Sequence, residues 1–312
     1  MGLFTPKDPP SVVYQKVVEN ASKGFSFFED EGVISFDRFR LVGIYDDRQY
    51  GYLMIRTRIP GGFMTSDQAR VIGEFVEEFG HKPDDRNDEE RFLEITTRQD
   101  IQLHWIKIEH MPELWRRYSE VGLTTFQACG NSTRNVTSCP VAGIDPNEAI
   151  DVKELVDEVN KFVLAKPELA AFLPRKFKTS ISGCLEDCTL ARINCISFTP
   201  ARKDNRLGFH VWLGGGLSDY PRLATQVNGF VERNQVIDYL TRSFVLKPSL
   251  IATISILGLD FAAGLSNAFL VELIFVWPGL SRYGMNAILR KDLNAISAVI
   301  LGTSGTKAAS GE

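Results

Sequence analysis

Cationic and amide side chains gather beside glycine or proline turns at four places in this 312-residue sequence. Two of these places repeat a cation at a spacing of two residues, Arg56 with Arg58 and Lys176 with Lys178. Side chains at this spacing on a strand point to one face of the sheet. The other two places hold Arg98, Gln99, Gln102, His104, Arg134 and Asn135. Several strands that present such groups in one direction would form a pocket for an oxyanion or a carboxylate-rich cofactor. Any one of these cations, taken alone, is more often a solvated surface residue.

Five cysteines offer a second kind of chemistry. Residues 1–10 carry no signal peptide, so a disulfide framework is not expected. Reduced thiols or metal ligands are the remaining interpretations. The five are Cys129, Cys139, Cys184, Cys188 and Cys195.

The composition is that of a soluble globular protein, with 44% hydrophobic and 24% charged residues. A net charge of −4 gives no global argument for a nucleic-acid partner, which would call for a basic stripe on the surface. It still permits a local basic pocket, because the field in a pocket depends on the arrangement of charges. We therefore expect a cytoplasmic protein that does not bind nucleic acid.

The predicted elements around Arg56 and around residues 98–104 follow one another in an order that is typical of one kind of domain. The predicted elements are strands at 50–58, 92–97 and 101–108 and helices at 67–79 and 111–121. Ser66 is the expected N-cap of the first helix. The order strand, helix, strand, strand, helix is typical of a split α+β unit. We assign it to residues 46–121, preceded by an arm at 1–45 that is extended or forms a short helix.

A second α+β unit is expected at residues 122–242. Its predicted elements are a helix at 147–165, strands at 176–182, 193–199 and 208–213, and short helices at 221–232 and 235–242. The cations at Lys176 and Lys178 would lie on the first of these strands.

The composition changes after Arg242. Residues 244–278 are mostly apolar, and a second apolar run follows at 295–301. The first run is long enough to span a bilayer, but Asp260 near its middle would be costly in lipid. A buried hairpin of helices is the alternative. We expect an apolar helical segment at 243–303 and a flexible tail at 304–312.

Seven short motifs occur in an order and spacing similar to those of the ferredoxin-dependent sulfite and nitrite reductases, which use siroheme. The resemblance covers about two thirds of the chain, from about Phe36 to Arg242. The motifs are RIPGG at 58–62, TTRQ at 96–99, QLHWI at 102–106, the pair Arg134-Asn135, SCPVAGID at 138–145, LPRKFK at 173–178 and WLGGGL at 212–217. The resemblance implies a ferredoxin-like half-domain followed by a siroheme-binding α+β domain.

The resemblance also implies roles for the polar residues. Siroheme is a macrocycle ringed with carboxylates, and the substrate anion binds the open axial position of its iron. Arg58, Arg134, Lys176 and Lys178 would line the substrate side. Arg98, Gln99, Gln102, His104 and Asn135 would hold the cofactor. The implied reaction is reduction of sulfite to sulfide with ferredoxin as electron donor, and His104 with Cys129-Gly130-Asn131 favours sulfite. Reduction of nitrite to ammonia is the alternative.

Members of this family carry a second, duplicated half whose cysteines bind a [4Fe–4S] cluster, and this sequence has no match to that half. We therefore expect weak or no turnover from this chain alone. Cys139, Cys184 and Cys188, with Cys129 or Cys195 as a fourth ligand, could hold such a cluster as a relic of the duplication. The alternative is that they are buried or unpaired thiols.

The apolar segment resembles another family. Residues 246–301 are similar to the last part of a permease subunit of dipeptide-type ABC importers, on the strength of Val271-Glu272 and Trp277-Pro278-Gly279-Leu280. The chain would then be a chimera. A second functional hypothesis follows, in which it is a non-catalytic protein associated with a membrane through residues 244–301.

Overall fold

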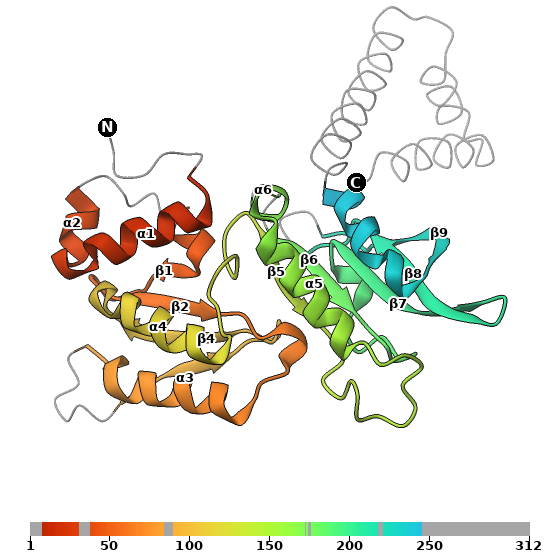
Figure 1. The fold of residues 1–312 in the computed structure, drawn as a ribbon, viewed down its shortest axis with the longest axis horizontal. Coiled ribbons are helices and arrows are strands. Elements are labelled where there is room, and N and C mark those ends of the chain that lie inside the picture. Colours follow the sequence, from red (N-terminus) through yellow and green to blue (C-terminus); the bar gives the residue numbers. More distant parts are fainter. Residues whose placement is uncertain are drawn as a thin grey trace, which may run out of the picture. The chain divides into compact units, whose positions relative to one another are not determined.

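The computed structural model describes residues 8–30, 38–83, 90–171, 173, 176–217 and 221–244. Residues up to Phe244 form one compact unit that contains two hydrophobic cores, each built on its own sheet (Figure 1). The apolar helical segment at 243–303, the permease-like sequence within it and the tail at 304–312 lie outside the described residues, apart from the helical end at 244. Among the helices that the structure describes, none is long and apolar enough to cross a membrane.

The first core lies between one face of an antiparallel sheet and the helices that cover it. The strand order is β1-β2-β4-β3, and the strands are β1 (Ile44–Asp46), β2 (Leu53–Thr57), β3 (Leu93–Ile95) and β4 (Ile101–Ile106). Along β2 the burial alternates, because Leu53 and Ile55 enter the core whereas Arg56 faces the other side. The sheet therefore has an apolar face toward α3 (Ser66–Phe79) and α4 (Met111–Val121) and a polar face opposite.

The N-terminal residues belong to this first core. They form α1 (Pro10–Asn20) and α2 (Phe25–Asp30), where we expected an extended arm or a short helix. Val13 and Val17, one helical turn apart on α1, are fully buried among the core residues. The helical period of these apolar positions explains why the segment docks instead of extending.

α3 and α4 lie where the sequence predicts them, and the N-cap of α3 differs by one residue. α4 covers the same residues that were predicted, because Pro112 stands in its first turn and Gly122 ends it in a left-handed conformation. The N-cap of α3 is Thr65, and Ser66 is already helical. The Thr65 hydroxyl accepts from the Gln68 amide while the Gln68 side chain accepts from the Thr65 amide, which completes a capping box.

The second core lies under a five-stranded mixed sheet in the order β5-β6-β7-β8-β9. The strands are β5 (Thr133–Thr137), β6 (Phe177–Ile181), β7 (Ile196–Lys203), β8 (Arg206–Leu213) and β9 (Thr225–Val231). The first three run parallel and the last two pairings are antiparallel. α5 (Lys153–Ala165), α6 (Pro167–Ala170) and a helix at 236–244 contribute to the core.

Two predictions for this unit were wrong in part. The short helix expected at 221–232 is instead the edge strand β9, because the threonine and valines of TQVNGFV favour extended backbone and pair with β8. The helix expected from 147 begins only at Lys153. The amides of Ala149 and Ile150 bond to the Gly183 carbonyl, which keeps that stretch out of the helix.

Single turns of 3₁₀ helix complete the framework. They are Ala21–Lys23, Phe39–Val42, Pro60–Gly62, Ile108–His110, Ala191–Ile193 and Arg233–Gln235.

Candidate functional site

The polar face of the first sheet carries a chain of hydrogen-bonded side chains. Arg56 on β2 donates through Nε to Gln102 Oε1 on β4 at 3.2 Å, and Gln102 Nε2 donates to Glu94 on β3. His104 lies two residues further along the same strand, with Nδ1 3.1 Å from Asp47 Oδ2 and Nε2 3.6 Å from Glu94 Oε2. As predicted, Gln102 and His104 share a face.

Arg58 continues from β2 into the second core. It is the largest fully buried side chain among the described residues, with 1% of its surface exposed. Its Nε donates to Asn160 Oδ1 on α5 at 3.0 Å, and its Nη1 donates to the carbonyls of Gln127 and Thr133 at 3.1 and 3.0 Å. Burial lowers the pKa of Arg58 to about 10, which leaves the guanidinium charged at neutral pH.

Arg98 and Arg134 approach the same region from different elements. Arg98, in the turn before β4, donates through Nη1 to Asn194 Oδ1 at 2.9 Å and through Nη2 to the Asn135 carbonyl at 2.7 Å. Arg134, on β5 and 2% exposed, donates through Nη1 to the Ala128 carbonyl at 2.9 Å. Burial and, to a smaller extent, the nearby Arg134 charge lower the pKa of Arg98 to about 10, although Asp100 acts in the opposite direction.

The buried Arg58 and Arg134 and the half-buried Arg98 form what we call the arginine cluster. Four of their nitrogen atoms are buried without any hydrogen-bond partner in the part of the chain that the structure describes. They are Arg58 Nη2, Arg98 Nε and Arg134 Nε and Nη2. Buried guanidinium donors are seldom left unsatisfied, because an uncompensated donor costs about 1–3 kcal/mol. The cluster therefore has the chemistry of a site for an anion.

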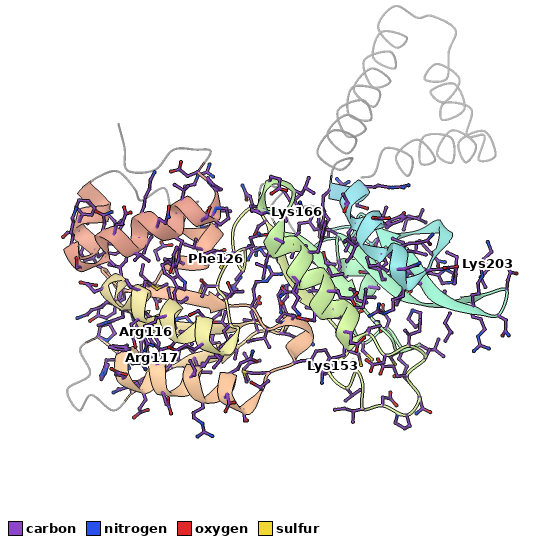
Figure 2. The ribbon with its side chains drawn as sticks, viewed as in Figure 1. Arg116, Arg117, Phe126, Lys153, Lys166 and Lys203 are labelled. Atoms are coloured by element: carbon purple, nitrogen blue, oxygen red, sulfur yellow. The ribbon has the colours of Figure 1, made fainter. Side chains whose placement is uncertain are left out.

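Two arginines on α4, away from the cluster, are paired with carboxylates. Arg116 and Arg117, labelled on α4 in Figure 2, both contact Glu113, at 2.7 Å from each Nε. Arg117 also contacts Glu78. Among the described residues, these two arginines, unlike those of the arginine cluster, leave no buried side-chain nitrogen without a hydrogen-bond partner.

Gln99 and Asn135 connect the two cores. Gln99 has a left-handed backbone, with φ 59°, and its side-chain amide exchanges two hydrogen bonds with the backbone of Ser138, at 2.8 and 2.9 Å. Asn135 Nδ2 donates to the carbonyls of Ile59, Arg98 and Gln99. Their donors are therefore occupied by backbone, and of the two side chains only Asn135 Oδ1 is left without a partner.

The two lysines differ in their environment. Lys178 lies half-buried on β6, and burial together with the charges of Arg98 and Arg134 lowers its pKa. Lys176 lies just before β6 and is exposed. Lys178 thus shares the electrostatic neighbourhood of the arginine cluster.

The thiols of three of the five cysteines, Cys139, Cys184 and Cys188, lie close together. Burial and the neighbouring thiols of Cys139 and Cys184 raise the pKa of Cys188 to about 12. Cys195 lies elsewhere, with Sγ 3.6 Å from the Lys176 carbonyl. Within the described residues, no group of three or more His, Cys, Asp or Glu side chains has the arrangement of a metal site. The cluster at Cys139, Cys184 and Cys188 therefore stays a prediction.

Asp100, which the sequence interpretation did not select, lies beside the arginine cluster. It is 2% exposed, and its Oδ1 has no hydrogen-bond partner among the described residues. It follows Gln99 directly and shares the strand period with Gln102 and His104, so the period of two could have identified it. Asn160 and Asn194, which accept from Arg58 and Arg98, carry no such signal because their partners are distant in sequence.

Comparisons with known proteins match both cores. Residues 45–121 match the family model described as the nitrite/sulfite reductase ferredoxin-like half domain, and residues 129–244 match the nitrite and sulphite reductase 4Fe-4S domain. The assimilatory ferredoxin-dependent nitrite reductase of Haloferax mediterranei is 38% identical over 234 residues, covering 72% of this chain and 40% of that protein. The sulfite reductase [ferredoxin] of Mycobacterium tuberculosis is 35% identical over 217 residues, covering 64% of this chain and 37% of that protein.

A solved structure shows the same arrangement of elements. The Mycobacterium tuberculosis NirA protein superposes with a TM-score of 0.65 at 30% sequence identity, over 76% of this chain and 44% of that chain. This chain spans about two fifths of the length of the curated relatives that it matches.

Proposed function

Residues 45–244 of this chain belong to the nitrite and sulfite reductase family, and on that premise we propose that the chain binds siroheme and takes part in the ferredoxin-dependent reduction of sulfite. The observation that carries the proposal is the set of four unpaired guanidinium nitrogens in the arginine cluster. A cofactor ringed with carboxylates and a substrate oxyanion are the partners that such donors require.

The residues of the site fit this assignment in two groups. Arg98, Gln102 and His104 would hold the macrocycle, with Arg98 Nε available for one of its carboxylates. Arg58, Arg134 and Lys178 would face the substrate, and Lys176 would lie at the rim. Gln99 and Asn135 would position the two cores around the cofactor, since their donors bond to backbone.

The charges of the arginine cluster and of Lys178 determine what these side chains would do in the reaction. When bound, siroheme supplies the iron that takes the substrate anion and passes electrons to it. The arginine cluster stabilises negative charge on the anion without reorganisation, because its donors are fixed by bonds to backbone carbonyls. Lys178, whose pKa is lowered by burial and by Arg98, is suited to deliver a proton to the reacting oxygen.

Sulfite and nitrite remain separate candidates for the substrate. Relatives at nearly equal identity are named as nitrite reductases and as sulfite reductases. We favour sulfite on the residues His104 and Cys129-Gly130-Asn131, with nitrite reduction to ammonia as the second candidate. Competition of the two anions for the siroheme-loaded chain, followed by absorbance, separates them.

Two parts of the family's chemistry stay predictions for this chain. One is a [4Fe–4S] cluster on its cysteines, and the other is turnover by this chain alone, which we expect to be weak or absent. The membrane-associated chimera also stays a prediction, since no observation on the described residues favours it.

The experiment that tests the proposal is an absorbance spectrum of the full chain, co-expressed with siroheme synthesis and purified anaerobically. A Soret band with the red-shifted visible band of siroheme is expected. Arg134→Ala and Lys178→Ala should then lose the spectral change that sulfite induces. Lys203→Ala, an exposed cation labelled in Figure 2 on β7, is the matched control and should keep it. A colourless wild-type protein would contradict the proposal.

A further inference from the structure

Asp100 is a buried carboxyl group held in a fixed position. Its backbone amide bonds to Thr96 Oγ1 at 3.1 Å, and its carbonyl accepts from the Thr96 amide at 2.9 Å. The tight turn from Thr96 to Asp100 therefore sets where the side chain begins. Oδ1 is buried and makes no hydrogen bond to any residue that the structure describes, although hydrogen-bond donors of the arginine cluster are also left unpaired.

Four arginines on three segments of the chain act on the charge of Asp100. Arg56 lies on β2, Arg58 follows β2, Arg98 lies in the same turn as Asp100, and Arg134 lies on β5. Burial raises the pKa of Asp100 to about 6, although the four arginines act in the opposite direction. Desolvation therefore outweighs the attraction of the cations.

A further ionisable neighbour is Cys129, and it does not compete for protons near neutral pH. Burial raises the pKa of its thiol to about 11, so the thiol stays neutral. Of these two groups, Asp100 is therefore the one that changes charge close to physiological pH.

An anion among the arginines would change this balance. Its negative charge would disfavour a second negative charge on Asp100 and would draw a proton onto the carboxyl group. A protonated carboxyl group is a hydrogen-bond donor, so it would bond to the anion instead of repelling it.

We propose that Asp100 is a proton-linked anion-binding residue, which takes up one proton when an oxyanion enters the arginine cluster and then donates that hydrogen to the oxyanion. The proton comes from solvent and forms the O–H bond of the carboxyl group, and no bond of the anion breaks in this step. The inference rests on the proposed function in one respect, because it takes the arginine cluster as the place of the anion.

The test is calorimetric titration of the full chain, without added siroheme, with nitrite as the probe. Nitrite keeps a single negative charge between about pH 5 and pH 8, so any proton uptake belongs to the protein. Titration at one pH in two buffers of different ionisation enthalpy gives the number of protons taken up per anion. Above the pKa of Asp100 the wild type should take up close to one proton, and its affinity should fall about tenfold per pH unit.

Three variants identify the residue that takes up the proton. Asp100→Asn keeps the shape of the side chain and cannot titrate, so it should bind nitrite with no uptake and no dependence on pH. Asp157→Asn, an exposed carboxylate on α5, is the matched control and should behave as wild type. Arg134→Ala should lose nitrite binding.

The outcomes separate the two proposals. Binding by the wild type without proton uptake, or uptake that persists in Asp100→Asn, overturns the role of Asp100 and leaves the siroheme assignment intact. The wild-type measurement decides this even where a variant fails to fold. Nitrite binding that survives Arg134→Ala, or its absence in the wild type, overturns the inference as well. The siroheme proposal is then judged by the absorbance spectrum alone.

Discussion

Arg58 and Arg134 are both buried arginines of the candidate site, but they differ in how many hydrogen bonds they make to the rest of the protein. Arg58 satisfies three acceptors on three segments, whereas Arg134 satisfies a single carbonyl. Removal of Arg58 takes a donor from each of these buried acceptors, and we expect Arg58→Ala to lower the free energy of unfolding by about 3–5 kcal/mol. Arg134→Ala should cost only about 1 kcal/mol. Urea unfolding of both variants without cofactor measures the difference, and equal losses would contradict it.

Asp100 gives a prediction of how the free energy of unfolding depends on pH. The folded protein holds its proton more tightly than the unfolded chain, because burial raises the pKa from 3.8 to about 6. The free energy of unfolding therefore falls as pH rises from about 4 to about 6, and the loss of about 3 kcal/mol persists above that. Asp100→Asn should stabilise the protein by about 1–3 kcal/mol at pH 7 and by much less near pH 4. Urea titrations at the two pH values test this, and a gain that is independent of pH would refute it.

The site residues show which contacts a sequence reveals. Arg58, Arg98 and Arg134 were predicted from their motifs, and the structure brings them together. Asp100 was not predicted because an anion pocket is expected to hold cationic and amide side chains. A buried carboxylate among them would repel the anion, so none was expected there. The bridging roles of Gln99 and Asn135 were missed for another reason. Their partners are backbone atoms of distant segments, and no local spacing encodes those.

At the scale of elements, the beginning of α3 offers a sharp test. Thr65 closes the capping box with Gln68, and Ser66 stands next to it inside the helix. We expect Thr65→Ala to lower the free energy of unfolding by about 1 kcal/mol, since it removes the acceptor for the Gln68 amide. Ser66→Ala should change it by a few tenths at most. Thermal unfolding of the two variants side by side decides the matter, and the reverse order would restore Ser66 as the cap.

The loop before α5 depends on a close backbone approach at Gly183. A Cβ atom there would lie 1.8 Å from the Ile150 carbonyl oxygen, inside the segment that Gly183 holds through two amides. We expect Gly183→Ala to cost about 3 kcal/mol or more, because backbone and not a flexible side chain must move. Gly73→Ala is the control, since open space surrounds Gly73 on α3, and it should stabilise the protein by about 0.5–1 kcal/mol. Chemical denaturation reports both, and a mild effect at Gly183 would mean that the loop shifts freely.

Elements with local start and stop signals were predictable, and those defined by pairing were not. Pro112 and Gly122 delimit α4 within the sequence itself. β9 was interpreted as a helix because its residues form a strand only through their register with β8, from Phe209 with Val231 to Leu213 with Thr225. The delayed start of α5 has the same origin, since the Gly183 carbonyl holds the preceding amides from more than thirty residues away.

At the scale of the whole compact unit, the site exists because two cores meet. Arg56, Gln102 and His104 come from the first sheet, and Arg134 and Lys178 come from the second. Asn135 on β5 joins them, donating to Ile59 O at 2.7 Å and to the carbonyls of Arg98 and Gln99 at 3.1 and 3.2 Å. Since Met1–Phe244 is one compact unit, the two cores should unfold together and not in sequence.

Asn135→Ala tests this coupling. The substitution removes the donor that serves three carbonyls around the site, and we expect it to lower the free energy of unfolding by about 1–3 kcal/mol. Because the cores are coupled, amide hydrogen exchange should quicken by a similar factor in β4 of the first core and in β6 of the second. Asn131→Ala, which changes an exposed asparagine in the loop before β5, should alter neither the free energy of unfolding nor the exchange rates. Faster exchange confined to β6 would mean that the cores open independently, and the arginine cluster would then be assembled only when a ligand draws the cores together.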